Sequence, residues 1–593
     1  MLQYLCKILQ KKNAEEKMNE LLLEPLKYYE KVGAAAHEQN LTEHFDTLVD
    51  KSGVDLAQNR ATAKKYRAEK AAIAKLEKSR NGKRTLRGFL IFFIIVGVVL
   101  SIYGIYALTQ GGIAGGICLG IGAPLIVLSI VLIKVVLNPA IKALETLLAE
   151  REKVAKALLD EAEKQVAPLN ALFKDDDTLR LIEKTMPEFV FENRFSAERQ
   201  EQFVKHYDLE VDQGQHCSVL DTLSGSFIEN PFVYCQQKVH YMGTHTYHGT
   251  LLITWTETYR DSNGKMQRRT RTQTLHASVT RPKPEYYTRK QLFYGCQAAA
   301  DLSFSREPKH SERLSESERE RKIKSGSKKL KKKEAKALKG KGNFQGMANT
   351  EFDVLFGASD RNHEVQFRLM YTPLAQCNTV DLLTSTAGYG DDFHFTKRRR
   401  CNMIMSEHAQ TWAMRPSAAY YYSYDVDEIR KKFMQFNQDY FKSVFFDFAP
   451  CFAVPAYMEK PSIAMEGERE YAGLYSAYEH EVMANQMGAQ TFAHTATQTE
   501  TILKTRFVER HGNEDVVQVT AYSFDTASRV DFIPVFGGDG RMHSVPVHWT
   551  EYIPLERVSN VKMTSARTLQ ASETNAEDIA KRFLYHGMAA WVL

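Results

Sequence analysis

The sequence lacks the short motifs by which most catalytic sites are recognised. It contains no P-loop and no GxGxxG dinucleotide motif, and no HExxH zinc motif, because His363-Glu364 and His480-Glu481 have no second histidine four residues on. Ser224 lacks the flanking glycines of a nucleophile elbow. These absences favour a non-enzymatic protein. We therefore assign no catalytic residue, no cofactor-binding residue and no cofactor from the sequence.

Cysteine is also sparse. The eight cysteines are scattered from Cys6 to Cys451 and form no CxxC pair. A disulfide framework or a zinc site would cluster them, so we expect reduced and mostly buried thiols in a reducing compartment. The N-terminal region is a mixed charged helix, and we expect no signal peptide there.

Three histidines, His240, His245 and His248, lie close together in the sequence, but no Cys, Asp or Glu stands beside them at ligand spacing. A zinc site usually needs four such ligands. The pattern argues against a metal site, and we assign no metal ligand.

Long apolar runs, by contrast, are present. Residues 88–137 hold two of them, joined by little more than the uncharged stretch 109–112. Each run is long enough to cross a bilayer core of ~30 Å at ~1.5 Å per helical residue. The sequence predicts a transmembrane helical hairpin in a multi-pass membrane protein, with the lipid bilayer as its first partner.

Basic residues lie where the chain enters the first span and where it leaves the second. They are Lys83, Arg84 and Arg87 before the first span, and Lys134 and Lys142 at and after the end of the second. Since basic loops stay in the cytoplasm, we expect both termini to be cytoplasmic and the tip of the hairpin to lie outside.

Small residues recur along both spans. Gly97 and Gly104 lie in the first, and Gly112, Gly116 and Gly120 lie in or beside the second. Glycines let helix backbones approach closely in lipid, so they are predicted to pack the hairpin, with a homo-oligomer through a glycine face as the alternative. Neither span has an ionisable residue near its centre, which argues against a pore.

The helices on either side of the membrane are predicted to pair. Residues 59–80 are rich in Ala, Lys and Glu, which are strong helix formers, and Asn81-Gly82 should break or bend this helix before the membrane. After the second span, apolar residues follow parts of a heptad pattern, which predicts a short coiled-coil stalk. The heptad positions are Ile141, Leu144, Leu148, Leu158, Val166, Leu169 and Leu172.

The remainder of the chain mixes strands and helices without a βαβ rhythm, which indicates an α+β fold rich in antiparallel sheet. The clearest hairpin spans 249–281 around Asn263-Gly264. A two-residue turn there would pair Trp255 with Thr272 and Ile253 with Thr274. A further strand is predicted at 232–241. Other strands are predicted within 351–371 and at 499–510, 515–525 and 528–537, and helices at 425–446, 467–487 and 575–588.

A basic segment separates two parts of this region. Residues 319–341 hold twelve Lys and Arg against two Glu, including Lys328, Lys329, Lys331, Lys332 and Lys333. The segment has three interpretations: a solvated linker, a contact with an anionic membrane surface, or a nucleic-acid contact. Nucleic acid is disfavoured because no aromatic residues are interleaved for base stacking.

The sequence thus divides into six parts. They are an N-terminal cytoplasmic helical region (1–87), the transmembrane hairpin (88–137), a helical stalk (138–183), a first α+β domain (184–308), a basic linker (309–343) and a second α+β domain (344–593).

Four strings in the soluble region resemble a group of uncharacterised bacterial inner-membrane proteins with two spans and a large soluble C-terminal region. They are Asn230-Pro231-Phe232, DLSFSREP (301–308), YGDDFHF (389–395) and DFAPCFAVPAY (447–457). The resemblance implies a bacterial inner-membrane location. It implies no role for any residue, because the function of the group is unassigned.

The function that we expect is that of a membrane-anchored protein whose cytoplasmic α+β region binds a protein partner or scaffolds an assembly. A lipid-binding or transport accessory protein is one alternative. An enzyme with an unrecognised site is the other, and Asp391, Asp392 and His394 are its candidate residues.

Overall fold

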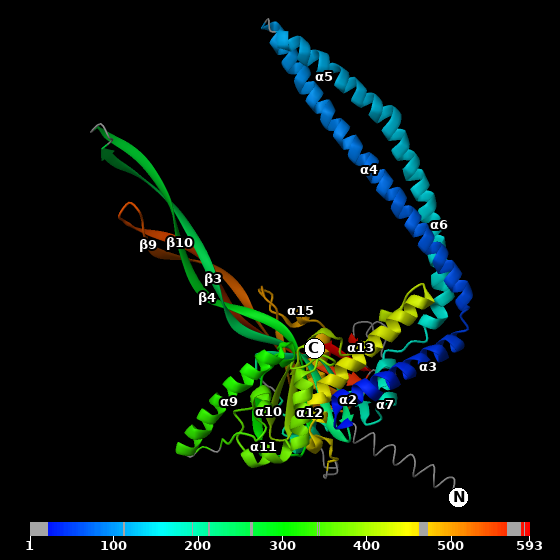
Figure 1. Cartoon of the computed structure of the whole chain (residues 1–593), viewed down its shortest axis with the longest axis vertical. Coiled ribbons are helices and arrows are strands. Elements are labelled where there is room, and N and C mark those ends of the chain that lie inside the picture. The colour runs from blue at the N-terminus through cyan, green and yellow to red at the C-terminus, as the bar shows by residue number, and fades with distance from the viewer. Residues whose placement is uncertain are drawn as a thin grey trace. The chain divides into compact units, whose positions relative to one another are not determined.

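The computed structural model describes residues 22–110, 113–192, 194–211, 214–260, 265–340, 342, 344–461, 472–565, 583–585 and 587–593. About half of it is helical and 29% is strand, with long apolar helices followed by antiparallel sheets, so the predicted α+β class is confirmed. The chain forms two compact units (Figure 1). We call them the helical unit (38–177 and 416–438) and the sheet unit (1–37, 178–415 and 439–593).

The helical unit is built on α4 (Leu56–Thr109), a single helix of 54 residues. Asp55 caps it by accepting a hydrogen bond from the Gln58 amide at 2.9 Å. Of the break or bend predicted at Asn81-Gly82, the break is wrong, because the helix continues through both residues. A glycine costs a helix only ~1 kcal/mol, and the strong helix formers on the N-terminal side outweigh this.

The chain returns along α4 in three consecutive elements. They are α5 (Ile113–Val131), the π-helical turn η2 (Leu132–Leu137) and α6 (Asn138–Asn170). The buried residues of α6 include five that recur every seventh position, the spacing expected for a helix packed along another helix. They are Ile141, Leu148, Ala155, Ala162 and Leu169. We call the paired part of α4 and α6 the stalk.

At the base of the stalk, Asn59 joins α4 to residues 424–426. Its side chain is fully buried, donates to the Tyr424 carbonyl and accepts from the Val426 amide, both at 3.0 Å. Val426 begins α13 (Val426–Phe452), which confirms the helix predicted at 425–446. The paired hydrogen bonds therefore tie the start of α13 to α4.

The sheet unit holds a seven-stranded antiparallel sheet of order β1-β2-β3-β4-β7-β6-β5. Its strands are β1 (Phe189–Glu192), β2 (Cys217–Phe227), β3 (Asn230–Arg260), β4 (Met266–Gly295), β5 (Ser303–Arg306), β6 (Phe393–Arg398) and β7 (Cys401–Ser406). The sheet takes strands from both sides of 309–343. The domain boundary expected at this segment is thus not a boundary of the sheet, since charge in a segment does not determine which strands pair across it.

The second sheet of the sheet unit, within the described residues, is five-stranded and has the order β11-β12-β10-β9-β8. They are β8 (Ile502–His511), β9 (Glu514–Phe536), β10 (Met542–Ser565), β11 (Phe583–Tyr585) and β12 (Met588–Val592). The strands predicted at 515–525 and 528–537 are one continuous strand. The helix predicted at 575–588 is wrong at its C-terminal end, where β11 and β12 lie; residues 575–582 and 586 are outside the described residues.

The β3–β4 and β9–β10 hairpins extend beyond these sheets and pack on each other; we call this pair of hairpins the arm (Figure 1). Ile253 and Leu275 of the first hairpin pack on Val545 of the second. The predicted pairing of Trp255 with Thr272 is wrong by one residue, because Trp255 pairs with Arg271. This register requires a loop with an odd number of residues instead of the two-residue turn.

The two strands predicted within 351–371 are wrong, because the structure has two helices and no strand there. The helices are α10 (Thr350–Phe356) and α11 (Glu364–Met370). Asn349 caps α10 by accepting from the Phe352 amide, and the ring centroids of Phe352 and Phe356 lie 5.2 Å apart, one helical turn from each other. The alternating apolar pattern had concealed this helical spacing.

The other helices with described residues are α2 (Pro25–Tyr28), α3 (Ala34–Ser52), α7 (Asp177–Thr185), α8 (Ala197–Tyr207), α9 (Glu316–Lys339), α12 (Pro373–Thr384), α14 (Ala477–Gln486) and α15 (Ala489–Phe492). Of the helix predicted at 467–487, residues 467–471 are outside the described residues and α14 forms its second half.

Candidate functional site

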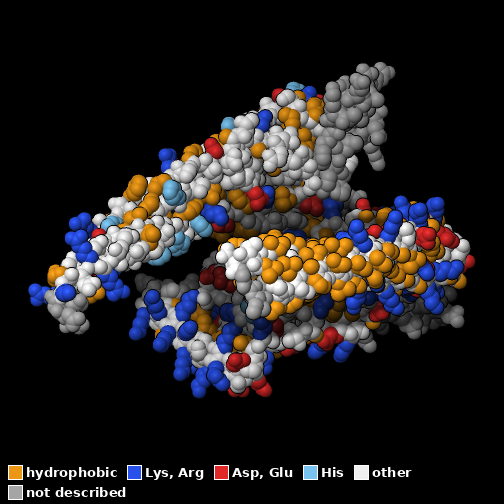
Figure 2. All heavy atoms as spheres, turned by 90° about the horizontal axis from the view of Figure 1, so that it is seen from above, with side chains coloured by type: hydrophobic (Ala, Val, Ile, Leu, Met, Phe, Trp, Pro, Cys, Tyr) orange, Lys and Arg blue, Asp and Glu red, His pale blue; other side chains and the backbone are white. Residues whose placement is uncertain are grey.

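Two stretches of the helical unit are long and apolar enough to span a membrane: Leu56–Thr109 and Gly116–Asn170. Their large apolar side chains are exposed in the unit, Phe92 by 58% and Ile102 by 64%. Figure 2 shows hydrophobic side chains covering this helical hairpin, with Lys and Arg side chains gathered at one end of it. An apolar surface of this extent is typical of lipid-exposed helices.

Helices α4 and α5 approach each other closely at Gly97 and Gly122. A Cβ at Gly97 would lie 3.0 Å from the Gly122 carbonyl oxygen, and a Cβ at Gly122 would lie 2.6 Å from the Ser101 Oγ. Gly104 is buried as well. These glycines therefore permit a backbone approach that larger residues would prevent.

The remaining candidate glycines do not take part in this contact. A Cβ at Gly116 or at Gly120 would meet no atom within 4 Å, and Gly112 lies outside the described residues. The expectation that Gly116 and Gly120 pack the hairpin therefore does not match the structure, in which Gly122 has this role. The sequence could not make this distinction because several glycine spacings in the second span fit equally well.

The basic residues that flank the spans lie at the membrane end of the stalk. Arg84 is paired with Glu145 of α6 at 2.5 Å, which links the two helices. Lys83 and Arg87 occupy neighbouring turns of α4, Lys134 lies in η2 and Lys142 in the first turns of α6. Lys134 and Lys142 are exposed, as a contact with lipid headgroups requires.

The basic segment is an ordered helix instead of a linker without structure. Ser315 and Glu318 form a reciprocal capping box at the start of α9. One face of α9 packs on the sheet unit: Gly326 lies against Val354 of α10, where a Cβ would be 2.5 Å away. Lys322 donates to the Lys309 carbonyl at 3.1 Å.

The opposite face of α9 is almost entirely basic (Figure 2). It exposes a row of lysines that form no ion pair with any residue that the structure describes. They are Lys324, Lys328, Lys329, Lys331, Lys332, Lys336 and Lys339. Lys333 differs, because its ammonium donates to the Ser359 carbonyl and lies 4.6 Å from the Phe344 ring centroid. Four of the five lysines singled out from the sequence are thus on the free face.

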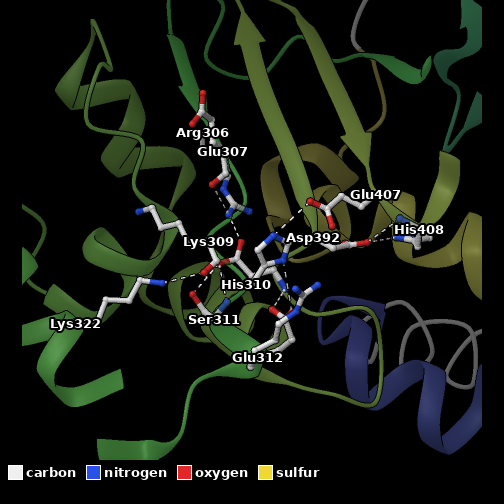
Figure 3. A network of polar contacts seen from close by, with 12 residues as sticks. Arg306, Glu307, Lys309, His310, Ser311, Glu312, Lys322, Asp392, Glu407 and His408 are labelled. Atoms are coloured by element: carbon white, nitrogen blue, oxygen red, sulfur yellow. Dashed lines mark hydrogen bonds and ion pairs between the residues drawn. The ribbon is translucent and has the colours of Figure 1, made fainter. Parts of the chain in front are cut away.

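Asp391 belongs to a fully buried ion pair. It binds Arg306, and both side chains have no exposed surface. Its second oxygen accepts from the Ser311 hydroxyl at 2.7 Å, and the Arg306 guanidinium lies 4.2 Å from the Phe393 ring centroid. Burial lowers the pKa of Arg306, and Asp391 opposes this shift. Figure 3 shows this part of the unit, with Arg306 and Ser311 labelled.

The neighbouring Asp392 turns to a different partner. Its carboxylate is 2.6 Å from His408 Nδ1 (Figure 3). His408 Nε2 is 3.1 Å from the Ser443 carbonyl. Tyr389 stacks on the imidazole with ring centroids 3.8 Å apart. Burial disfavours the charged imidazole, but Asp392 and Asp447 outweigh it, so the pKa of His408 is raised.

The candidate residues of the enzyme hypothesis therefore do not converge. Asp391 and Asp392 bind different side chains, although one network of polar contacts joins them through His310 and the two glutamates beside it (Figure 3). His394 lies further along β6, half-buried, with a pKa lowered by burial. Neither carboxylate has the free, substrate-facing position that a general acid or base needs. We interpret this network as part of the fold.

The histidines of β3 are likewise dispersed. His240 lies 5.1 Å from Tyr286 between ring centroids, His245 contacts Tyr247 at 4.6 Å, and His248 is exposed further along the strand. Within the described residues, no group of three or more His, Cys, Asp or Glu side chains could hold a metal ion.

The strings that carried the family resemblance meet in one core of the sheet unit. Arg306 of the second string binds Asp391 of the third. Phe232 of the first packs against Phe448 of the fourth at 5.1 Å between ring centroids, and the Asn230 amide donates to the Glu459 carbonyl. Sequence reasoning missed these contacts. The sequence offered one signal, a basic residue in the second string and acidic residues in the third.

Two cavities of about 560 Å³ each lie in the sheet unit. The first is polar, but its charged groups are satisfied: Arg398 pairs with Glu210 at 3.0 Å, and Arg289 donates to Gln237 at 2.9 Å. The second is mainly apolar and is lined by aromatic residues that include Tyr286 and Phe524.

No family model, no curated protein and no solved structure matches this chain. The site must therefore be interpreted from its own geometry.

Proposed function

We propose that this chain is a membrane-anchored, non-enzymatic adaptor whose α9 free face binds an acidic partner protein in the cytoplasm. The observation that carries the proposal is the unpaired row of lysines on a helix that is itself held in place. The α4–α5 hairpin supplies the anchor, and the stalk supplies a spacer. At ~1.5 Å per residue, the 33 residues of α6 span ~50 Å.

The order of α9 supports a binding role over that of a linker. A solvated basic linker needs no cap and no packed face, whereas α9 has a capping box and a glycine set against Val354. Like charges three and four residues apart destabilise a helix by ~0.2–0.5 kcal/mol per pair. The lysines of α9 therefore repel one another on an ordered surface. A partner of opposite charge would relieve this repulsion.

A protein partner fits this face better than a lipid surface. Helices that lie on membranes combine basic residues with large apolar ones that insert among the lipid chains. Leu338 is the only large exposed apolar residue of α9 in the described structure. Aromatic side chains, which would stack on unpaired bases, are absent from the α9 sequence.

Site-specific photo-crosslinking tests the proposal in cells that express the full chain. With p-benzoylphenylalanine at Lys332, we expect one discrete adduct with another protein. The same probe at Val365, an exposed residue of α11 in the same unit, is the control and should give none.

Charge reversal then separates specific binding from proximity. Lys328→Glu with Lys329→Glu should remove the adduct at position 332. An equal reversal on α4, Lys70→Glu with Lys75→Glu, should leave it unchanged. No adduct at 332, or adducts that survive the α9 reversal, would contradict the proposal.

A further inference from the structure

The arm has two chemically different sides. Odd-numbered residues of its two hairpins face each other, with Ile253 and Leu275 packed on Val535 and Val545. Because side chains alternate along a strand, the even-numbered residues of β9 and β10 point away from this interface. In the outer part of the arm they include three large apolar side chains, each at least 60% exposed. These are Phe532, Phe536 and Met542.

The register makes this apolar side continuous across both strands. Phe536 pairs with Met542, and Phe532 pairs with Pro546. On the opposite side of the arm, the even-numbered residues of β3 include several threonines, such as Thr250 and Thr254, together with the exposed Leu252. The β9–β10 side differs in that it presents two phenylalanines and a methionine on neighbouring cross-strand pairs.

Basic residues surround the far end of the arm. The β3–β4 hairpin extends past β9–β10, whose end is marked by the Gly538 amide donating to Gln273 at 2.7 Å. Beyond that point three arginines are exposed and form no ion pair within the described structure: Arg269 on the face that continues the apolar side, and Arg260 and Arg268 on the other face. Figure 2 shows Lys and Arg side chains gathered around this end of the arm.

We propose that the far end of the arm binds an anionic lipid surface, with Phe532, Phe536 and Met542 inserted at the level of the headgroups. Large apolar residues that enter the interface and arginines that bind lipid phosphates are the two components of such contacts. Tyr259, half-exposed on the odd side of β3, points the same way as the apolar side and adds an aromatic residue suited to the interface.

Lipid fits this end better than a second copy of the chain. Pairing two arms through their apolar sides, end to end, would bring the unpaired arginines of both copies together, and no described acidic residue compensates them. Anionic headgroups neutralise the same charge. The inference rests on the proposed membrane anchorage and does not depend on α9.

The arm extends far from the sheets of its own unit. Pairing of β3 with β2 ends at Val239, so residues 240–260 belong to the arm and extend for ~70 Å at ~3.3 Å per residue.

The test uses the full chain in vesicles of phosphatidylcholine, with or without one quarter phosphatidylglycerol. With p-benzoylphenylalanine at Phe536, we expect a lipid adduct in the mass spectrum that rises several-fold with phosphatidylglycerol and falls in high salt. The same probe at Thr250, on the opposite side of the arm, should yield little. Arg268→Glu with Arg269→Glu should reduce the adduct roughly tenfold or more, whereas Lys331→Glu with Lys332→Glu on α9 should not change it.

Three results would overturn the inference. They are equal lipid adducts at both probe positions, an adduct with a second copy of the chain in place of lipid, and no adduct although the chain floats with the vesicles. A chain that does not float with vesicles would overturn the anchorage on which the inference rests. Loss of the partner adduct at Lys332 would affect only the adaptor proposal.

Discussion

At the scale of single residues, the sheet unit depends on charges that are buried and paired. Arg306 and Asp391 have no exposed surface, and Ser311 satisfies the second carboxylate oxygen. A buried pair of this kind adds little net stability compared with apolar residues, but losing one partner leaves the other charge buried and uncompensated. The pair therefore acts as a constraint on how β5 and β6 meet.

Arg306→Met should lower the free energy of unfolding by about 3–5 kcal/mol, because Asp391 would remain buried without its partner. Chemical denaturation of the purified full chain measures this loss. Arg398→Met is the control: Arg398 pairs with Glu210 on the surface, and its loss should cost at most about 1 kcal/mol. Equal losses for both variants would contradict this account.

His408 should make stability depend on pH. Its folded-state pKa is raised above the ordinary 6.5, since Asp392 and Asp447 outweigh the burial that opposes the charge. The stabilisation is therefore complete below pH 6.5 and is lost as the pH rises through the raised value.

Melting temperatures of the parent chain and of His408→Gln across a pH series measure this contribution. The difference between the two should shrink as the pH rises above 6.5. A difference that is constant, or that grows with pH, would show that His408 is not charged in the folded protein.

At the scale of elements, the contact between α4 and α5 depends on Gly97 and Gly122. Gly122→Ile should separate the helices, because even its Cβ would lie 2.6 Å from the Ser101 Oγ and 2.8 Å from the Gly97 carbonyl oxygen. Hydrogen–deuterium exchange of the full chain in lipid nanodiscs should then show faster exchange along α5.

Gly120→Ile is the matched control, since a Cβ there meets no atom within 4 Å. Its exchange should remain close to that of the parent chain. If Gly120→Ile loosens α5 as much as Gly122→Ile does, or lowers the oligomeric state in the nanodisc, a glycine face between copies would be the better account.

Elements with strong periodicity could be predicted from the sequence, and those fixed by local capping or by loop length could not. The apolar spacing of 425–446 identified α13. The alternation in 351–371 instead predicted strands, because the Asn349 cap and the Phe352–Phe356 contact that stabilise α10 involve only a few residues. The β3–β4 register differed by one residue, since the number of residues in the loop was assumed from Asn263-Gly264.

At the scale of the whole chain, the two units could not be predicted by dividing the sequence into consecutive segments, because each unit combines segments that are far apart in the chain. The sheet order depends on long-range pairs such as Leu292 with Ile404, which join segments on opposite sides of α9. The basic face of α9, which is the candidate binding site, was predicted in part. The lysines of 328–333 were recognised by composition, but the packed and free faces of α9 depend on Gly326 and Val354, which only the structure brings together.

Each functional proposal depends on a two-span anchor that leaves the sheet unit in the cytoplasm, and labelling of engineered cysteines tests this most directly. In intact cells, with the exposed Cys377 replaced by serine, a membrane-impermeant maleimide should label Gln110→Cys at the tip of the hairpin. It should label Ser325→Cys on α9 only after the cells are permeabilised. Labelling of Ser325→Cys in intact cells would contradict the account.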